Sequence, residues 1–302
     1  MVEESNIENH ELGSVPWAEM SPDLLIEVFK WLPVMDRLRT LPQICKAWKK
    51  ASFDPRCWQV VDIEKWSIDQ AVKAVDSMVR LVIKRSCGSI QELRVAYLNG
   101  DEILHFLAQS GLSSLKILCV PCSYITENGL CELILSLPNL EHLDISRCDS
   151  IHSEGLKVIG QSCKSLRRLD RVMWPVSSST LVLDDSEAMA IAQYMPKLKH
   201  LVMSSDWVSK SSLDAILASC KHLDFVEVKS ADDNEDNTVD EDDEDDMDDE
   251  DDDAYGDSAF SFDEDYVDTD DYFDYEDDVD DDEDGNDVDD DEDDLDDEDD
   301  LD

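Results

Sequence analysis

Apolar residues recur in a repeating pattern between about residues 90 and 230. The copies open with Leu or Ile, and those at Leu115, Leu140 and Leu198 read L-x-x-L-x-apolar, an alternation that predicts a short β-strand. A turn follows, and then apolar residues three and four positions apart predict an amphipathic helix. The copies open at Ile90, Leu115, Leu140, Leu166, Leu198 and Leu223. The pattern therefore predicts an α/β fold built from stacked strand–helix units.

The spacing of the copies is 25, 25, 26, 32 and 25 residues, which lies within the range of leucine-rich repeats apart from one insertion at 174–187. A less regular copy precedes them, because the letters CWQVVDIEKW predict a strand and a helix follows through about Arg85. Stacked repeats of this kind form a short curved solenoid with an exposed strand face.

The register of the repeats predicts which side chains point to solvent on that strand face, namely those two, four and six positions after each opening residue. A mixture of charged, imidazole and apolar side chains at these positions suits a protein-binding surface, with plain solvated strands as the alternative. The predicted substrate contacts are Arg94, Ile117, His142, Asp144, Arg168, Asp170, His200, Phe225 and Glu227, and Glu92 and Lys229 share the same register.

Cysteine alternates with Leu and Met three residues before each copy opens. Because free cysteine behaves as a small hydrophobe, we predict that Cys87, Cys163 and Cys220 lie in the core. Cys119 and Cys122 have C-x-x-C spacing, but a zinc site needs about four converging ligands and the chain has no second C-x-x-C pair. We therefore predict neither a bound metal nor a cofactor.

The stretch WAEMSPDLLIEVFKWLP, which begins at Trp17, predicts a separate amphipathic helix. Ser21 can cap its N-terminus, Pro22 suits its first position, and a second proline ends it. Its apolar stripe consists of Leu24, Leu25, Val28, Phe29 and Leu32. Short helices are predicted at about 35–41 and 44–51. Three short helices cannot bury so much Trp, Phe and Leu among themselves, so some apolar surface meets either the first repeat or another protein.

Acidic residues are concentrated at the C-terminal end of the 302-residue chain, whose net charge is −51. Residues 231–302 hold 46 Asp or Glu and no Lys or Arg, whereas residues 1–230 carry a net charge of only −5. Like charges repel, and the segment has too little apolar surface to offset an ordering entropy of roughly 1–2 kcal/mol per residue. We therefore predict a disordered tail at 231–302, and a flexible N-terminus at 1–16.

Two features of this tail suggest functions of its own. Asp280, Asp282 and Asp284 have EF-hand spacing, but position 12 is Asp291 instead of Glu, which predicts only loose cation binding. Aromatic residues lie among the acids at 255–275, and we expect this stretch to fold back on the more basic end of the repeats and compete with substrate. A purely solubilising segment is the alternative.

Other motifs restrict the class of protein. No apolar run reaches the roughly 18 residues of a membrane span, and the acidic N-terminus lacks the apolar segment of a signal peptide. Nine cysteines then indicate a reducing compartment, so we expect the nucleus or the cytoplasm. No G-x-S-x-G, Gly-rich phosphate loop or H-E-x-x-H is present. We expect a protein that is not an enzyme and that binds neither membrane nor nucleic acid directly.

The segment WAEMSPDLLIEVFKWLPVMDRLRTLPQICKAWKKASFDPRCW resembles the F-box. The resemblance rests on a Trp, an acidic residue with Leu-Leu, an apolar pair, Leu-Pro, an Asp and a Cys-x-x-Trp in this order, while Met20-Ser21 stands where the F-box has Leu-Pro. It implies that these helices dock on a Skp adaptor, which links to a cullin. The implied adaptor contacts are Trp17, Met20, Pro22, Asp23, Leu24, Leu25, Val28, Phe29, Leu32, Pro33, Ile44, Cys45 and Trp48.

An F-box followed by cysteine-bearing leucine-rich repeats resembles the plant F-box/leucine-rich-repeat proteins. The implied organisation is an F-box at 17–57 and repeats at 58–230. The implied function is that of a substrate receptor in an SCF-type ubiquitin ligase, monomeric within the complex, that presents an unidentified protein for ubiquitination and degradation. Two alternatives assign the function to the tail: an acidic chaperone or decoy for basic proteins, and a cation-buffering protein.

Overall fold

The computed structural model describes residue 17 and residues 20–173, 185–204 and 208–229. The chain divides into two units, Met1–Ala254 and Tyr255–Asp302, and all described residues belong to the first. The predictions for the N-terminus at 1–16, for most of the insertion and for the acidic tail with its EF-hand-like and aromatic stretches lie outside the described residues.

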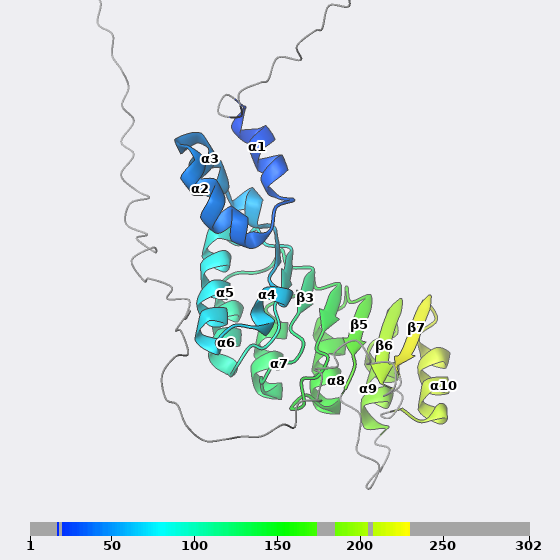
Figure 1. Cartoon of the computed structure of the whole chain (residues 1–302). Helices are drawn as coiled ribbons and strands as arrows, with labels where there is room; N and C mark the ends of the chain where they lie inside the picture. The colour runs from blue at the N-terminus through cyan, green and yellow to red at the C-terminus, as the bar shows by residue number, and fades with distance from the viewer. Residues whose placement is uncertain (1–16, 18–19, 174–184, 205–207, 230–302) are drawn as a thin grey trace, which may run out of the picture. The chain divides into compact units, whose positions relative to one another are not determined.

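Seven parallel strands form one sheet whose spatial order follows the sequence from β1 to β7 (Figure 1). Their bounds are β1 (Val60–Asp62), β2 (Glu92–Arg94), β3 (Ile117–Cys119), β4 (His142–Asp144), β5 (Arg168–Arg171), β6 (His200–Ser204) and β7 (Phe225–Lys229). Each strand from β2 to β7 begins two residues after a predicted opening residue, and β1 confirms the less regular first copy. The predicted α/β fold with a parallel sheet is therefore confirmed.

Helices connect the strands, as parallel pairing requires, and α5 to α10 line up beside one another in Figure 1. Their bounds are α4 (Glu64–Ile68), α5 (Val72–Ser86), α6 (Asp101–Gln109), α7 (Glu127–Leu135), α8 (Ser153–Ser162), α9 (Ser186–Tyr194) and α10 (Lys210–Ser219). Their apolar faces and the central leucines of the strands make the core, in which Leu93, Leu118, Leu143, Leu169 and Leu201 are fully buried.

Carboxylates link the N-termini of α6, α7 and α8 in succession. Asp101 of α6 accepts hydrogen bonds from the backbone N–H and the hydroxyl of Thr126, which caps α7. Glu127 of α7 accepts the N–H of Gly155 in α8 at 2.7 Å. A Cβ atom on Gly129 or Gly155 would lie 2.4 or 2.8 Å from these carboxylates, so the glycines leave room for the link. Each of these glycines directly precedes a buried leucine, Leu130 or Leu156, so close packing explains the small residue at this position of the repeat.

The predicted burial of cysteines is confirmed at Cys163 and Cys220 and is wrong at Cys87, which is exposed. Cys163 and Cys220 end their helices with φ near −87°, whereas Cys87 ends α5 in the left-handed region with φ of 46°. That turn swings the Cys87 side chain outward, and Ser86 is buried one position earlier, with its hydroxyl bonded to the carbonyl of Ile83.

A buried arginine occupies a core position of the fifth strand. Arg171 lies where the preceding copy has Ile145, and its side chain is only 1% exposed. Its guanidinium pairs with Glu187 of α9 at 3.0 and 3.1 Å and donates to the carbonyls of Ile145, Cys148 and Ile151. Arg171 therefore links β5, which precedes the insertion, to α9, which follows it.

Short helices precede the sheet: α1 (Pro22–Phe29), η2 (Asp36–Thr40), α2 (Leu41–Ile44), α3 (Lys46–Ser52) and η3 (Pro55–Trp58). The predicted cap of α1 is confirmed, because the Ser21 hydroxyl accepts the N–H of Leu24. The helix predicted at 44–51 is wrong at its start, since Cys45 is fully extended and separates α2 from α3. The helix predicted at 35–41 is a π-helix; Pro42 has no N–H for the preceding turn, which favours this wider winding.

Arg37 joins these helices to the sheet. Its buried guanidinium donates to the carbonyls of Cys57 and Val60 and lies 5.2 Å from the ring centre of Trp58. The indole of Trp58 is also fully buried and donates to the carbonyl of Ser52 at 2.9 Å. These hydrogen bonds connect the short helices to the first strand, and we call Arg37 and Trp58 with their partners the junction.

Candidate functional site

The helix α1 has two apolar faces. Leu25 and Phe29 are fully buried in the core of the short helices, together with Ile26. Leu24, Val28 and Trp31 are 59%, 38% and 88% exposed. Leu24 and Val28 are one turn apart on α1, and Trp31 follows in the turn after the helix, where its N–H donates to the carbonyl of Val28. We call these three exposed residues the α1 stripe. The single stripe predicted from the sequence therefore divides into a buried and an exposed half.

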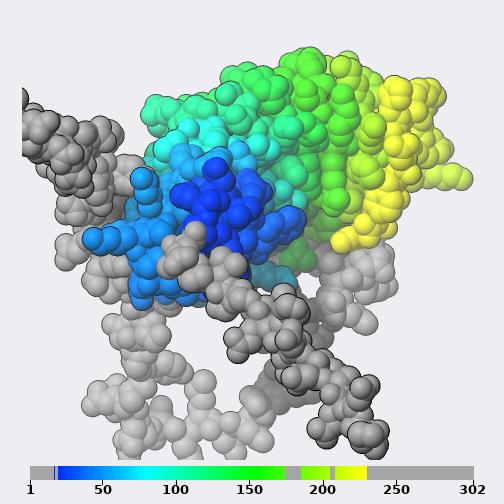
Figure 2. All heavy atoms as spheres, turned by 90° about the horizontal axis from the view of Figure 1, so that it is seen from above, coloured from blue at the N-terminus to red at the C-terminus, as the bar shows by residue number. Residues whose placement is uncertain are grey.

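Other apolar residues of the short helices are also exposed, and Figure 2 shows these helices (blue) on the face turned to the viewer. Ile44 is 51% exposed at the end of α2. Trp17 is 55% exposed and lies edge-on against Trp48, whose indole donates to the Trp17 carbonyl at 3.2 Å. Trp48 packs in turn on Phe29, with 5.1 Å between ring centres.

The predicted adaptor contacts therefore differ in how accessible their side chains are to a partner. Leu25 and Phe29 belong to the core. The partly buried contacts are Met20, Leu32, Cys45 and Trp48. The exposed contacts are Trp17, Pro22, Asp23, Leu24, Val28, Pro33 and Ile44. Asp23 is exposed beside Arg56, with 2.9 Å between the carboxylate and the guanidinium. Trp31 was missed, although its spacing from Leu24 and Val28 carried the signal.

The strand face is polar. Arg168, His200 and Phe225 are exposed there. The partly buried predicted contacts are Arg94, Ile117, His142, Asp144 and Glu227, and Glu92 and Lys229 are similar. The prediction that Asp170 faces solvent is wrong, because this residue is only 7% exposed. Side chains on the neighbouring positions cover it.

Asp170 organises its neighbours on the strand face. Its carboxylate accepts hydrogen bonds from the Arg168 guanidinium at 2.9 Å and lies 2.9 Å from Nε2 of His142. Burial works to raise the pKa of the Asp170 carboxyl, but the bonds from His142 and Arg168 outweigh it and hold that pKa below its usual value. Burial raises the pKa of the Asp144 carboxyl one strand away, even though it accepts the N–H of Ser146 at 2.9 Å.

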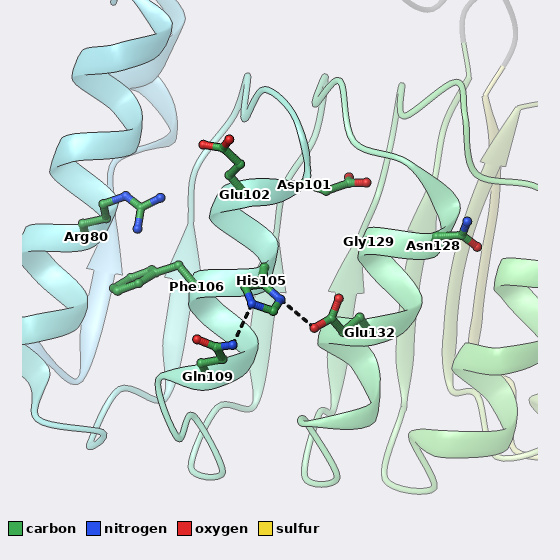
Figure 3. A pocket seen from close by; sticks show the side chains of 9 residues that line it. All are labelled: Arg80, Asp101, Glu102, His105, Phe106, Gln109, Asn128, Gly129 and Glu132. Atoms are coloured by element: carbon green, nitrogen blue, oxygen red, sulfur yellow. Dashed lines mark hydrogen bonds and ion pairs between the residues drawn. The ribbon is translucent and has the colours of Figure 1, made fainter.

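A groove of about 610 Å³ lies on the helices instead of the strand face (Figure 3). The Arg80 guanidinium lies 4.6 Å from the ring centre of Phe106, and His105 is bonded to Gln109 at 2.6 Å and to Glu132 at 2.7 Å. The remaining lining residues are Asp101, Glu102, Asn128 and Gly129. The dashed lines in Figure 3 show that both ring nitrogens of His105 already have hydrogen-bond partners, Gln109 and Glu132.

The C-x-x-C pair does not form a ligand set. Cys119 is buried and accepts a hydrogen bond from Arg94, and burial raises the pKa of its thiol to about 12. Within the described part of the chain, no three His, Cys, Asp or Glu side chains converge as a metal site. No helix among the described residues is long and apolar enough to cross a membrane.

The structure combines a small helical module that exposes an apolar stripe with a sheet that exposes a polar strand face. Residues 17–60 match the F-box domain family. The chain is 41% identical over 215 residues to the F-box protein FBW2 of Arabidopsis thaliana, which covers 70% of this chain and 67% of FBW2.

Two further relatives also come from Arabidopsis thaliana. The F-box protein SKIP19 is 30% identical over 223 residues, covering 72% of this chain and 71% of SKIP19. The putative F-box/LRR-repeat protein 9 is 31% identical over 211 residues, covering 68% of this chain and 84% of that protein. The chain belongs to the plant F-box/leucine-rich-repeat family.

Proposed function

We propose that the protein is the substrate-recognition subunit of an SCF-type ubiquitin ligase. In this proposal the F-box binds a Skp adaptor, the adaptor links to a cullin, and the sheet holds a protein substrate. The receptor performs no bond chemistry; it raises the effective concentration of the substrate near the charged conjugating enzyme. The proposed location is the nucleus or the cytoplasm.

The α1 stripe is the observation that carries this proposal. Leu24, Val28 and Trp31 are exposed although the opposite face of the same helix already has its core. Contiguous exposed apolar surface marks interaction sites, and tryptophan is enriched among the residues that dominate binding energy. F-box proteins generally act as SCF substrate receptors, which fits an adaptor as the partner of this stripe.

The sheet is proposed to be a leucine-rich-repeat solenoid that receives the substrate. Its seven strands follow in sequence order, each joined to the next through helix-containing connections, and the polar strand face faces away from the leucine core. The junction at Arg37 and Trp58 supports a fixed geometry between adaptor and substrate, because both side chains are buried and bonded.

The affinity of the full-length protein for a Skp adaptor tests the proposal, measured by calorimetry. Leu24→Asp places a charge in the α1 stripe and should weaken binding at least about tenfold. Leu217→Asp is the matched control, because Leu217 is 47% exposed on α10, far along the chain from the F-box, and it should leave the affinity unchanged. Equal affinities for both variants would overturn the proposal.

The acidic segment at 231–302 supports a second candidate, a chaperone or decoy for basic proteins. This function predicts salt-sensitive binding of a basic protein such as a histone, which Leu24→Asp leaves unchanged. Loss of adaptor binding in that variant, with histone binding intact in the same preparation, would show that the F-box function is separate from the tail. A protein that binds only histone would favour the second candidate.

A further inference from the structure

One row of side chains crosses the strand face. Strand pairing aligns Ile117 of β3 with His142 of β4, His142 with Arg168 of β5, Arg168 with His200 of β6, and His200 with Phe225 of β7. From β3 to β7 the row therefore reads apolar, imidazole, guanidinium, imidazole, apolar, and Glu92 of β2 continues it beyond Ile117. Phe225 is exposed, and its ring centre lies 6.0 Å from that of His200.

The central guanidinium is held in place from one side. Nε and Nη2 of Arg168 both lie 2.9 Å from an oxygen of Asp170, which is itself almost completely buried. The Arg168 side chain is nevertheless 47% exposed. Asp170 holds one edge of the Arg168 guanidinium, so the other edge faces solvent in a fixed direction. The N–H groups of a guanidinium edge match the oxygens of a carboxylate or phosphate.

Two further cationic residues lie next to the centre of the row. Arg167 and Lys199 come directly before β5 and β6, which begin at Arg168 and His200. Acidic residues hold the equivalent positions on the flanking strands, Glu141 before β4 and Asp224 before β7. Glu141 lies 3.9 Å from Lys116, which partly balances it. The other carboxylates near the row are Glu92, Asp144, Asp170 and Glu227.

We propose that the strand face binds an anionic side chain of its substrate, a phosphoserine or a glutamate, at Arg168 and apolar side chains on either side at Ile117 and Phe225. This inference rests on the proposed function of the face. Neighbouring strands lie about 4.8 Å apart, so each apolar site is about 10 Å from Arg168. A segment in the polyproline II conformation rises about 3.1 Å per residue with about three residues per turn, so side chains three positions before and after the anion point to the same side as the anion, about 9 Å from it.

Peptide binding to the full-length protein, complexed with its Skp adaptor, tests the inference by fluorescence anisotropy. Four libraries of nine-residue peptides carry leucine three positions before and after a central phosphoserine, glutamate, serine or lysine, with the other positions randomised. The phosphoserine library, the glutamate library or both should bind at least about tenfold more tightly than serine and lysine. Phosphoserine well ahead of glutamate identifies phosphate as the ligand, and similar affinities identify a carboxylate as sufficient.

Variants separate recognition from a structural effect. Arg168→Ala should abolish the anion preference, and Arg168→Lys should retain part of it, while both remain folded at the assay temperature and keep the adaptor affinity of the wild type. Arg80→Ala on the helix side is the matched control and should retain the full preference. Phe225→Asp should weaken all four libraries.

Two results would overturn the inference and are distinguishable. Four libraries of equal affinity, all weakened by Phe225→Asp, would refute anion recognition and leave the strand face as the substrate site. Libraries that bind equally to wild type and Phe225→Asp would refute the substrate site itself. The adaptor affinity of the same samples reports independently on the F-box.

Discussion

The buried pair of Arg171 and Glu187 should dominate the stability of the sheet. Arg171→Met removes a guanidinium that is 1% exposed and replaces it with an apolar side chain of comparable length. Glu187 then keeps a buried carboxylate without its partner, which costs about 3–5 kcal/mol. The carbonyls of Ile145, Cys148 and Ile151 also lose their side-chain donor.

The carbonyls of Ile145 and Cys148 keep the backbone N–H groups of Cys148 and Ile151 as donors, at 3.3 and 3.2 Å. The expected loss in the free energy of unfolding for Arg171→Met is therefore at least about 4 kcal/mol, most of it from the unpaired carboxylate, with about 1–3 kcal/mol more from the Ile151 carbonyl. Glu187→Gln keeps an acceptor for the guanidinium and should cost less. The double variant Arg171→Met/Glu187→Leu removes the unpaired charge but leaves the three carbonyls, so it should recover only part of the loss.

Urea unfolding of the full-length protein, followed by circular dichroism, measures these differences by linear extrapolation. Arg80→Met is the control, because Arg80 lies over Phe106 on the outer side of the helices and should cost less than about 1 kcal/mol. A loss below about 1 kcal/mol for Arg171→Met, or a double variant as stable as the wild type, would refute the reasoning.

Three further predictions concern the junction, a helix contact and pH. Arg37→Met should lower the free energy of unfolding by about 1–3 kcal/mol, because the carbonyls of Cys57 and Val60 lose their donor; unchanged urea unfolding would contradict it. Gly160→Ala places a Cβ 2.7 Å from the backbone oxygen of Tyr194 and should cost about 1–3 kcal/mol, which differential scanning calorimetry would detect as a lower Tm. Burial raises the pKa of Asp144, so its ionised form opposes folding at neutral pH and stability should increase as pH falls toward that pKa. Asp144→Asn should then raise Tm at pH 7 and reduce this pH dependence, and a lower Tm at pH 7 would count against it.

The repeating part of the fold was predictable because its signal is periodic. Leu93, Leu118, Leu143 and Leu169 all occupy the position three residues after an opening residue, and all are fully buried. Errors arose where one copy departs from the average. Cys87 has the same sequence position as Cys163, but a left-handed turn directs its side chain outward.

Arg171 shows a different limit. A charged residue at a core position is acceptable only because Glu187 lies opposite it, and this partner is 16 residues away across the insertion. Asp170 is likewise buried by His142 and Arg168, whose side chains come from neighbouring positions of the sheet. In both cases a buried charge is paired with side chains from other parts of the fold, and the sequence of a single repeat does not contain these tertiary contacts.

The F-box surface was predictable in position and not in detail. Leu24 and Leu25 are adjacent and chemically identical, yet one is 59% exposed and the other fully buried. Helical periodicity identifies both as apolar, but the packing of α1 on Trp48 and Trp58 decides which half of the stripe remains outside. Trp31 belongs to the exposed half for the same reason.

Retention of a cullin by the immobilised full-length protein tests the central claim most directly, because it requires the α1 stripe to bring the chain into a ligase. We expect the wild type to retain cullin only when a Skp adaptor is added, Leu217→Asp to behave in the same way, and Leu24→Asp to retain neither adaptor nor cullin. Cullin retained without the adaptor, or retained equally by Leu24→Asp, would contradict the account.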